Sequence, residues 1–229
     1  MQKIVVLSGA GISAESGIST FRDADGLWEG HDVMAVASPQ GWENDQALVL
    51  DFYNQRRRQL KEVHPNAAHK AIAKLEDKFE VVVVTQNVDD LHERGGSKKI
   101  IHLHGELNKV RSTGNPEHVT IWTEDLHLGD LCPDGYQLRP HIVWFGEMVP
   151  MLEPAIEECA SADIIMIVGT SMQVYPAAGL VQYANPNCQV YYIDPKPNIS
   201  YELKRKPNLH VIAEPATIGV VGLVEELLF

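Results

Sequence analysis

The sequence predicts an α/β fold built on a doubly wound parallel sheet with a small inserted lobe. Short apolar runs recur along the chain, and each is bounded by glycine or polar residues. Their hydrophobicity is continuous rather than alternating, which is typical of strands buried on both faces. We therefore expect strands at residues 4–7, 81–84, 100–103, 142–145, 164–168 and 190–193.

Helix-like stretches lie between several of these runs, at residues 67–75, 153–159, 177–183 and 220–228. Strands that alternate with helices imply a parallel, Rossmann-like sheet. Two segments interrupt the alternation, because residues 30–63 carry no strand pattern and residues 106–139 are polar and poorly periodic. We expect these two segments to form the small lobe and residues 1–29, 64–105 and 140–229 to form the larger domain. A lobe inserted beyond the carboxyl ends of the strands would cover a ligand-binding cleft.

Composition and charge limit the partners of the protein. The 229 residues carry a formal net charge of −12, with an isoelectric point near 5.2. This charge disfavours nucleic acid and anionic membrane as partners, because both favour a basic surface. Three well-separated cysteines form no disulfide framework, which favours a reducing compartment. No signal-peptide pattern or membrane-spanning apolar run is present, so we expect a cytoplasmic protein.

A glycine-rich turn, Gly9-Ala10-Gly11, follows the first predicted strand. Such a turn permits close approach of a pyrophosphate, whose charge a following helix N-terminus would favour. A plain strand–helix turn remains an alternative. In an ordinary dinucleotide-binding unit a second strand would follow, but residues 20–28 have no strand pattern. This disfavours a hydride-transferring dehydrogenase.

Five sequence blocks carry a resemblance to a known family. Residues 9–22 read GAGISAESGISTFR, residues 85–92 read TQNVDDLH and residues 103–105 read LHG. Residues 143–147 read VWFGE, and residues 169–178 read GTSMQVYPAA. In this order, and over nearly the whole chain, the blocks resemble the sirtuins, and the bacterial CobB-like branch of the desuccinylase type fits best. The resemblance implies an NAD-dependent protein-lysine deacylase.

The resemblance also implies that NAD is consumed as a co-substrate and binds extended across the carboxyl edge of the sheet. The residues expected to hold the pyrophosphate and cover the nicotinamide ribose are Gly9, Ala10, Gly11, Phe21 and Arg22, with further contacts from Ile12, Ser13, Asp23 and Trp28. The residues expected at the ribose and nicotinamide are Gln86, Asn87, Val88 and Asp89. Those expected near adenosine are Gly169, Thr170, Ser171, Asp194 and Ala216, although the family often has Asn in place of Asp194.

His104 is the predicted catalytic residue. It ends a strand-like run at the carboxyl edge of the sheet, where an imidazole with a pKa near neutrality suits a general base. The residues alone also allow a structural histidine, or a metal pair with His102, which lacks a third ligand nearby. The resemblance implies that His104 deprotonates the ribose hydroxyls after the acyl oxygen displaces nicotinamide, giving free lysine and 2′-O-acyl-ADP-ribose. Asn87 is expected to orient the ribose or a water, and Asp89 to read the nicotinamide amide.

Tyr53 and Arg56 are the predicted readers of the acyl group. They are three residues apart in a helical stretch and therefore share one face. An arginine fork and a phenol hydroxyl would hold the distal carboxylate of a succinyl, malonyl or glutaryl group. Alternatively, Arg56 belongs to a solvated basic face. The pair resembles that of sirtuins that prefer acidic acyl groups, and the small side chain of Ala37 would leave the pocket roomy enough for these groups, with acetyl also accepted.

Acylated-lysine proteins are the expected partners, bound largely through main-chain pairing with strands at residues 146–147 and 174–175. The residues expected to contact them are Val143, Phe145, Gly146, Glu147 and Val174. The oligomeric state stays open.

Zinc is predicted to be absent. Most sirtuins hold a structural zinc with two Cys-x-x-Cys pairs, and tetrahedral thiolate coordination needs these ligands. Here only Cys132 occupies one of the four positions, while the spacing of His118 and His127 matches no common zinc finger. We expect the small lobe to depend instead on apolar packing by Val119, Ile121, Trp122, Leu126, Leu128 and Leu131.

Three alternatives to deacylation are weighed. Mono-ADP-ribosyl transfer to protein would use the same NAD site, but an acyl-reading pair argues against it. A non-catalytic NAD sensor would have no need of His104 or Asn87. Hydride transfer is disfavoured by the missing second strand.

Overall fold

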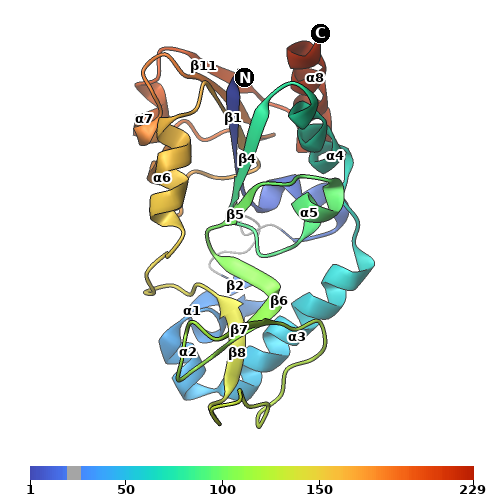
Figure 1. Ribbon diagram of the computed structural model, residues 1–229, viewed down its shortest axis with the longest axis vertical. Helices are drawn as coiled ribbons and strands as arrows, with labels where there is room; N and C mark the ends of the chain where they lie inside the picture. The colour runs from blue at the N-terminus through green and yellow to red at the C-terminus, as the bar shows by residue number, and fades with distance from the viewer. Residues whose placement is uncertain (20–26) are drawn as a thin grey trace.

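Six parallel strands form the central sheet of the larger lobe, as the computed structural model shows (Figure 1). The structure describes residues 1–19 and 27–229. The strand order is β11-β10-β9-β1-β4-β5, so the chain starts in the middle of the sheet and builds outward first on one side and then on the other. The strands are β1 (Lys3–Ser8), β4 (Glu80–Thr85), β5 (Ile100–His102), β9 (Ile164–Val168), β10 (Gln189–Ile193) and β11 (Leu209–Ile212).

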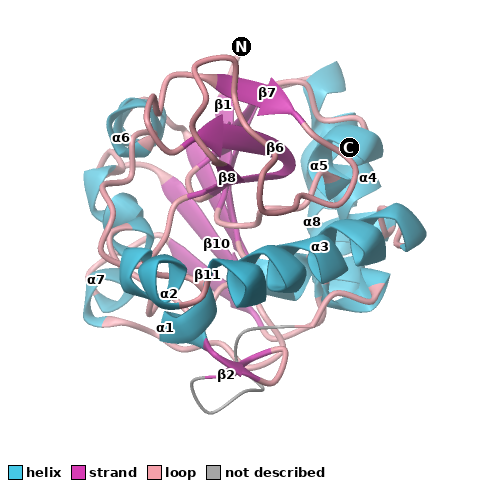
Figure 2. Ribbon diagram, turned by 90° about the horizontal axis from the view of Figure 1, so that it is seen from below, coloured by secondary structure: helices cyan, strands magenta, loops and turns pink. Residues whose placement is uncertain are grey.

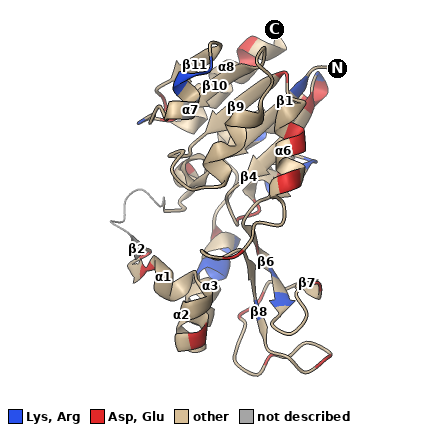
Figure 3. Ribbon diagram, turned by 90° about the vertical axis from the view of Figure 1, so that its left-hand side faces the viewer, with Lys and Arg blue, Asp and Glu red and all other residues tan. Residues whose placement is uncertain are grey.

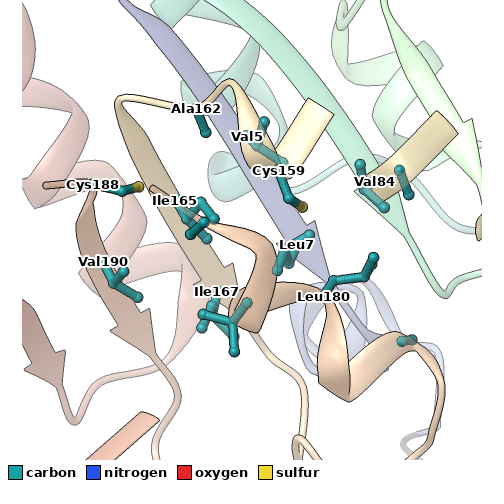
Figure 4. Close-up of a cluster of buried hydrophobic side chains, with 14 of the residues drawn as sticks. Val5, Leu7, Val84, Cys159, Ala162, Ile165, Ile167, Leu180, Cys188 and Val190 are labelled. Carbon is teal, nitrogen blue, oxygen red and sulfur yellow. The ribbon is translucent and has the colours of Figure 1, made fainter. Parts of the chain in front are cut away.

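Both faces of this sheet are buried, because each apolar strand divides its side chains between two cores. In β1, Val5 and Leu7 pack toward α6 (Leu152–Ala160) and the 3₁₀ helix Ala177–Tyr183 (Figure 4). Ile4 and Val6 point to the opposite face, toward α4 (Ala67–Lys74) and α8 (Ala216–Leu228). Each buried Val or Ile contributes about 1.5–3 kcal/mol to folding. Continuous apolar runs therefore supply buried side chains to both faces of the sheet, as the predicted doubly wound fold requires.

The smaller lobe combines helices with antiparallel strands. A three-stranded sheet of order β7-β6-β8 packs beside α3, and the view from below shows α3 lying next to α1 and α2 (Figure 2). The elements are β2 (Leu27–Trp28), β3 (His31–Asp32), α1 (Val33–Val36), α2 (Pro39–Asn44), α3 (Gln46–Glu62), β6 (Gly105–Ser112), β7 (Val119–Ile121) and β8 (Leu138–Ile142). The chain enters this lobe after β1 and after β5, the two places where the sequence predicts it to leave the sheet.

Arg94 joins the end of α3 to the larger lobe. It belongs to α5 (Leu91–Gly95), and its guanidinium donates hydrogen bonds to the carbonyls of Leu60 and Val63. Figure 3 shows the basic residues of α3 at this end of the helix. The carboxyl ends of the parallel strands face the smaller lobe (Figure 1), so the loops that follow them meet α3 and the antiparallel sheet.

The predicted elements are largely confirmed, with some corrections. Five predicted strands lie in the parallel sheet, but the run 142–145 contributes only Ile142, to β8. Strand β11 was not predicted, because two of its four residues are exposed and no continuous apolar run marks it. Residues 177–183 form a 3₁₀ helix rather than an α-helix, and residues 31–32 and 105–121 contain strands that the sequence pattern does not reveal. The division of the chain at residues 29, 63, 105 and 139 stays a prediction.

Among the described helices, none is both long and apolar enough to cross a lipid bilayer. The three cysteines, at positions 132, 159 and 188, are free and buried.

Hydrogen bonds hold the loop between β7 and β8 together with apolar packing of a few of its side chains. The Gln137 amide nitrogen contacts the carbonyls of His127 and Asp130 at 3.0 and 3.2 Å, and its oxygen accepts from Gly129 N at 2.8 Å. The predicted apolar packing is wrong for four side chains that are 39–74% exposed, namely Val119, Ile121, Leu128 and Leu131. Only Leu126 is fully buried, while Trp122 packs at the edge of the core.

We expect the purified protein to contain no stoichiometric zinc and to keep its melting temperature in the presence of chelators. Among the described residues, no group of three or more His, Cys, Asp or Glu side chains is arranged to hold a metal. Cys132 instead contacts the Ser112 hydroxyl at 3.3 Å. A single thiolate cannot complete a tetrahedral site. Elemental analysis tests this expectation, and near-equimolar zinc would contradict it.

Candidate active site

A cavity of about 1130 Å³ lies where the carboxyl ends of the parallel strands meet the smaller lobe. The loops after β1, β4, β5, β9 and β10 form one wall, and α3 and the segment after β8 form the other. It is lined by most of the predicted site residues: Gly9, Ala10, Gly11, Trp28, Ala37, Arg56, Gln86, Asn87, Val88, Asp89, His104, Val143, Phe145, Gly146, Glu147, Gly169, Thr170, Ser171, Val174, Asp194 and Ala216.

Three of the predicted residues that the structure describes do not line the cavity. Ile12, Ser13 and Tyr53 are buried behind its wall. Phe21, Arg22 and Asp23 lie outside the described residues.

The glycine turn after β1 packs directly against a second glycine turn after β9. Gly11 N donates to Gly169 O at 2.8 Å, and a Cβ atom on Gly11 would lie 2.6 Å from the Cα atom of Gly169. Gly169 has φ +59°, a conformation that favours glycine. The close contact between the two loops therefore requires these glycines, in addition to any requirement that a ligand would set. The segment that follows is two 3₁₀ turns, Ala10–Ile12 and Ala14–Ser16, rather than the helix expected there.

Ser13 fixes two of the side chains that line the nicotinamide end of the predicted site. Its hydroxyl donates to Asp89 Oδ2 at 3.0 Å and accepts from Asn87 Nδ2 at 3.2 Å. His69 Nε2 lies 3.5 Å from the same oxygen. Burial raises the pKa of Asp89 to about 6 and lowers that of His69 to about 4. Ser13 thus acts on the site from behind the wall, because its hydroxyl holds the orientation of the Asn87 amide and of the Asp89 carboxylate.

His104 is oriented as a base at the end of β5. Its Nδ1–H donates to the carbonyl of Gln86 at 3.1 Å, so the neutral ring carries its lone pair on Nε2. The residue lines the cavity, and burial lowers the pKa of the imidazole. The unprotonated form therefore dominates at neutral pH. A ring held by its Nδ1 atom with Nε2 available is the arrangement that proton abstraction requires.

His102 is engaged in a separate ion pair. Its Nε2 lies 2.6 Å from Glu93 Oε1, and its Nδ1 lies 3.3 Å from the carbonyl of Asn87. Burial lowers the pKa of His102, but the Glu93 carboxylate outweighs this and leaves the pKa raised. Both ring nitrogens face acceptors, which does not favour a metal pair with His104.

Arg56 and Tyr53 occupy different depths of the small lobe. Arg56 lines the cavity, packs over the Phe52 ring at 4.3 Å and donates from Nη1 to the Phe52 carbonyl. Its Nε has no hydrogen-bond partner among the described residues. Tyr53 is fully buried, and its hydroxyl accepts a hydrogen bond from Trp144 Nε1 at 3.0 Å. The expectation that both side chains line one pocket is therefore met by Arg56 and not by Tyr53.

A tight turn after β8 presents main chain to the cavity. Val143 N donates to His104 O and Phe145 N donates to Ala37 O, each at 2.9 Å. Gly146 has φ +89°, and nothing lies within 4 Å of the place where a Cβ would be. Residues 146–147 and 174–175 are turn and loop rather than the strands predicted for peptide pairing.

The adenosine end of the predicted site has a carboxylate at the end of a strand. Asp194 follows β10, is almost fully buried and accepts a hydrogen bond from Lys196 N at 2.8 Å. In a dinucleotide-binding sheet, a carboxylate at the end of a strand accepts hydrogen bonds from ribose hydroxyls. Ala216 begins α8 beside it, and both residues line the cavity.

Several lining residues were missed by sequence reasoning. Glu29, Gln59 and Lys196 line the cavity from segments without a recognised role, and Trp144 lines it from the block at residues 143–147. Trp144 lies inside a block that carries the family resemblance, which was a usable signal. Glu29 and Gln59 reach the site only because the small lobe folds over the sheet, and no local pattern shows this.

Comparison with known proteins agrees with this geometry. A sequence model described as the Sir2 family matches residues 9–176. A Helicobacter pylori protein named NAD-dependent protein deacylase is 57% identical over 228 residues, which cover 100% of this chain and 98% of the relative. A Bacteroides thetaiotaomicron protein of the same name is 51% identical over 234 residues, covering 100% of this chain and 99% of the relative.

Solved structures show the same fold. A Sir2 homologue in complex with NAD superposes with a TM-score of 0.87 at 37% identity, covering 98% of this chain and 89% of that one. Sir2 bound to a p53 peptide and NAD⁺ gives a TM-score of 0.78 at 28% identity, covering 98% and 91%. With whole-length identity above one half to named relatives and a family match across its site residues, the chain belongs to the Sir2 family.

Proposed function

We propose that this NAD-dependent protein deacylase preferentially removes acyl groups that end in a carboxylate, succinyl and malonyl, from lysine side chains of proteins. Glutaryl and acetyl groups are accepted as well. The products are free lysine, nicotinamide and 2′-O-acyl-ADP-ribose. The observation that carries the acyl preference is the guanidinium of Arg56, which lines the cavity with a positive charge that a distal carboxylate would pair with.

The described residues fit NAD as a co-substrate. Two glycine turns, at residues 9–11 and 169–171, bring backbone into the cavity at the switch point of the sheet, where doubly wound folds bind dinucleotides. Asp194 and Ala216 would hold adenosine, and Asn87 and Asp89, both fixed by Ser13, would hold the nicotinamide half. Bound NAD supplies an electrophilic ribose carbon with nicotinamide as its leaving group.

His104 would accept a proton from the ribose hydroxyls. The Gln86 carbonyl holds its Nδ1–H, so Nε2 is the basic atom. Asn87 would orient the ribose or a water at the same point. The amide oxygen of an acyl-lysine is a weak nucleophile, so the site must gain much of its acceleration from positioning it in a desolvated cavity. The turn at residues 143–147, tied by its backbone to His104 and Ala37, would provide that positioning.

Arg56 would recognise the distal carboxylate of the acyl chain. An arginine fork matches a carboxylate and remains charged even when burial lowers its pKa, as it does here. Ala37, which lines the same cavity, has a small side chain that leaves room for an acyl chain longer than acetyl. The Tyr53 hydroxyl lies behind the wall, and because an indole N–H can only donate, this hydroxyl keeps its own hydrogen for a second bond.

Mono-ADP-ribosyl transfer is the second candidate, because it would use the same NAD site. It gives no role to the guanidinium of Arg56 in the cavity lining, so deacylation accounts for more of the lining residues.

A single peptide carrying acetyl-, succinyl-, malonyl- or glutaryl-lysine tests the preference. We expect kcat/KM to be highest for the succinyl and malonyl forms. Equal values for all four groups, or a preference for acetyl, would contradict an acid-reading role for Arg56.

A further inference from the structure

A buried cluster behind the acyl-lysine wall is centred on Arg139 of β8. Its guanidinium lies 3.3 Å from the ring centroid of Trp144, stacked on the indole. Its Nη1 and Nη2 atoms donate to the two carboxylate oxygens of Glu147 at 2.7 and 3.1 Å, and Nη2 also donates to the Ile142 carbonyl at 2.9 Å. One side chain thus contacts the beginning, middle and end of the turn that borders the cavity.

Glu147 closes this turn from its other end. Besides Arg139, its carboxylate accepts from Arg111 Nη2 at 3.1 and 3.0 Å and from the backbone N–H of Trp144 at 2.8 Å. Glu147 N in turn donates to the Trp144 carbonyl at 3.0 Å. Two arginines and one backbone amide therefore fix a single carboxylate, which leaves the turn little freedom to move.

The indole of Trp144 connects the turn to α3. Its Nε1–H donates to the Tyr53 hydroxyl at 3.0 Å, and Tyr53 is three residues before Arg56, which lines the cavity. A chain of direct contacts therefore runs from Arg139 through Trp144 to the helix that presents the acyl-reading arginine.

The same turn is attached to the chemistry of the site. Val143 N donates to the carbonyl of His104, and Phe145 N donates to the carbonyl of Ala37. A displacement of the turn would move the peptide-binding main chain relative to the catalytic histidine. It would not move the glycine turns at residues 9–11 and 169–171, which pack against each other on the sheet.

We propose that Arg139 is a positioning residue for the acyl-lysine substrate, which holds Trp144 and the turn at residues 143–147 in the binding geometry through stacking and a two-pronged ion pair. Lysine cannot replace it, because an ammonium offers neither the flat face nor the parallel donors. Arg139 touches no reacting atom. This inference rests on the proposed function, since it assigns Arg139 to the acyl-lysine half of the site and not to the NAD half.

The test compares Arg139→Lys with wild type and with Arg205→Lys. Arg205 also packs over an aromatic ring, that of Tyr201 at 5.5 Å, but it directly follows α7 (Tyr201–Lys204) and is outside the cavity lining. A fluorescent succinyl-lysine peptide gives the peptide Kd by anisotropy without NAD, calorimetry gives the Kd for ADP-ribose, and steady-state assays give KM and kcat.

For Arg139→Lys we expect the peptide Kd and KM to rise about ten- to a hundredfold, because a displaced wall misplaces the substrate. The Kd for ADP-ribose should stay within about twofold of wild type, and Arg205→Lys should match wild type in every measurement. Trp144→Phe keeps an aromatic face for stacking but loses the N–H and one ring of the indole, so its peptide Kd should also rise. An unchanged peptide Kd in Arg139→Lys, or equal losses for peptide and ADP-ribose, would overturn the positioning role.

Glu147→Gln keeps the test decisive if Arg139→Lys does not fold. It retains shape and removes the ion pair, and it should raise the peptide Kd with ADP-ribose binding intact; an unchanged peptide Kd would again overturn the role. Failure of the proposed function has a different signature, because wild type itself would then neither bind the acylated peptide nor release nicotinamide in its presence.

Discussion

His104→Ala is expected to abolish deacylation while leaving NAD binding largely intact. In the proposed mechanism the imidazole accepts a proton from the ribose hydroxyls at Nε2, and its only described hydrogen bond, from Nδ1 to the Gln86 carbonyl, does not involve the pyrophosphate loops. A positioned general base contributes roughly 10²- to 10⁴-fold to a rate. Product formation by the variant, with ADP-ribose affinity measured separately, checks this expectation.

His210→Ala is the matched control, because His210 lies on β11, stacks on Tyr191 and is not among the residues lining the cavity. It should turn over substrate like wild type. Turnover by His104→Ala within about a factor of ten of wild type would remove His104 from the general-base role.

The pH profile of the wild-type enzyme gives a second test of this role. Burial lowers the pKa of His104, so the base form persists at neutral pH, and activity should fall only at a pH below the range in which an ordinary histidine becomes protonated.

Arg56→Met is expected to impair removal of succinyl and malonyl groups selectively and to spare acetyl. An acidic acyl chain gives up its hydration when it enters the cavity, and only a charge-assisted partner offsets that loss. Losing one such partner costs on the order of 2–5 kcal/mol, or about 30- to several-thousand-fold in kcat/KM. Methionine loses the guanidinium that lies over the Phe52 ring but keeps an unbranched, adaptable apolar side chain there, so packing should survive. The measurement is kcat/KM for succinyl and acetyl versions of one peptide.

Arg58→Met provides a control on the same helix. Its side chain is 56% exposed, pairs with Asp51 and Asp125, and is not among the residues lining the cavity. It should leave both substrates unaffected. Tyr53→Phe should act in the same direction as Arg56→Met but more weakly, because it removes one neutral hydroxyl from behind the wall. Equal effects of Arg56→Met on succinyl and acetyl peptides would refute the acyl-reading assignment and leave the deacylase assignment intact.

The parts of the fold that follow local rules were predictable from the sequence. Continuous apolar runs such as residues 81–84 and 164–168 are buried on both faces of a parallel sheet, and they are strands here. His104 could be placed at the sheet's carboxyl edge because it directly follows such a run. The glycines at positions 9, 11 and 169 were recognised as a loop pattern, although their contact with one another was not foreseen.

The features that depend on distant partners were not predictable. Residues 142–145 have the composition of a strand, yet Phe145 N bonds to the Ala37 carbonyl and Trp144 N to the Glu147 carboxylate, so the backbone leaves the ladder. The depth of Tyr53 depends on Trp144, 91 positions further along the chain. Helical spacing places Tyr53 and Arg56 on one face of α3, but it cannot show which of them reaches the cavity.

Nicotinamide release with and without an acylated peptide tests the central claim most directly. The purified protein is incubated with NAD and either a succinyl-lysine peptide or the same peptide unmodified, and nicotinamide, 2′-O-acyl-ADP-ribose and NADH are quantified. We predict release of nicotinamide in equal amount to deacylated peptide, only when the acyl group is present, with no NADH. Release that is independent of the acyl group, with ADP-ribose attached to protein, or the formation of NADH would contradict NAD-dependent deacylation.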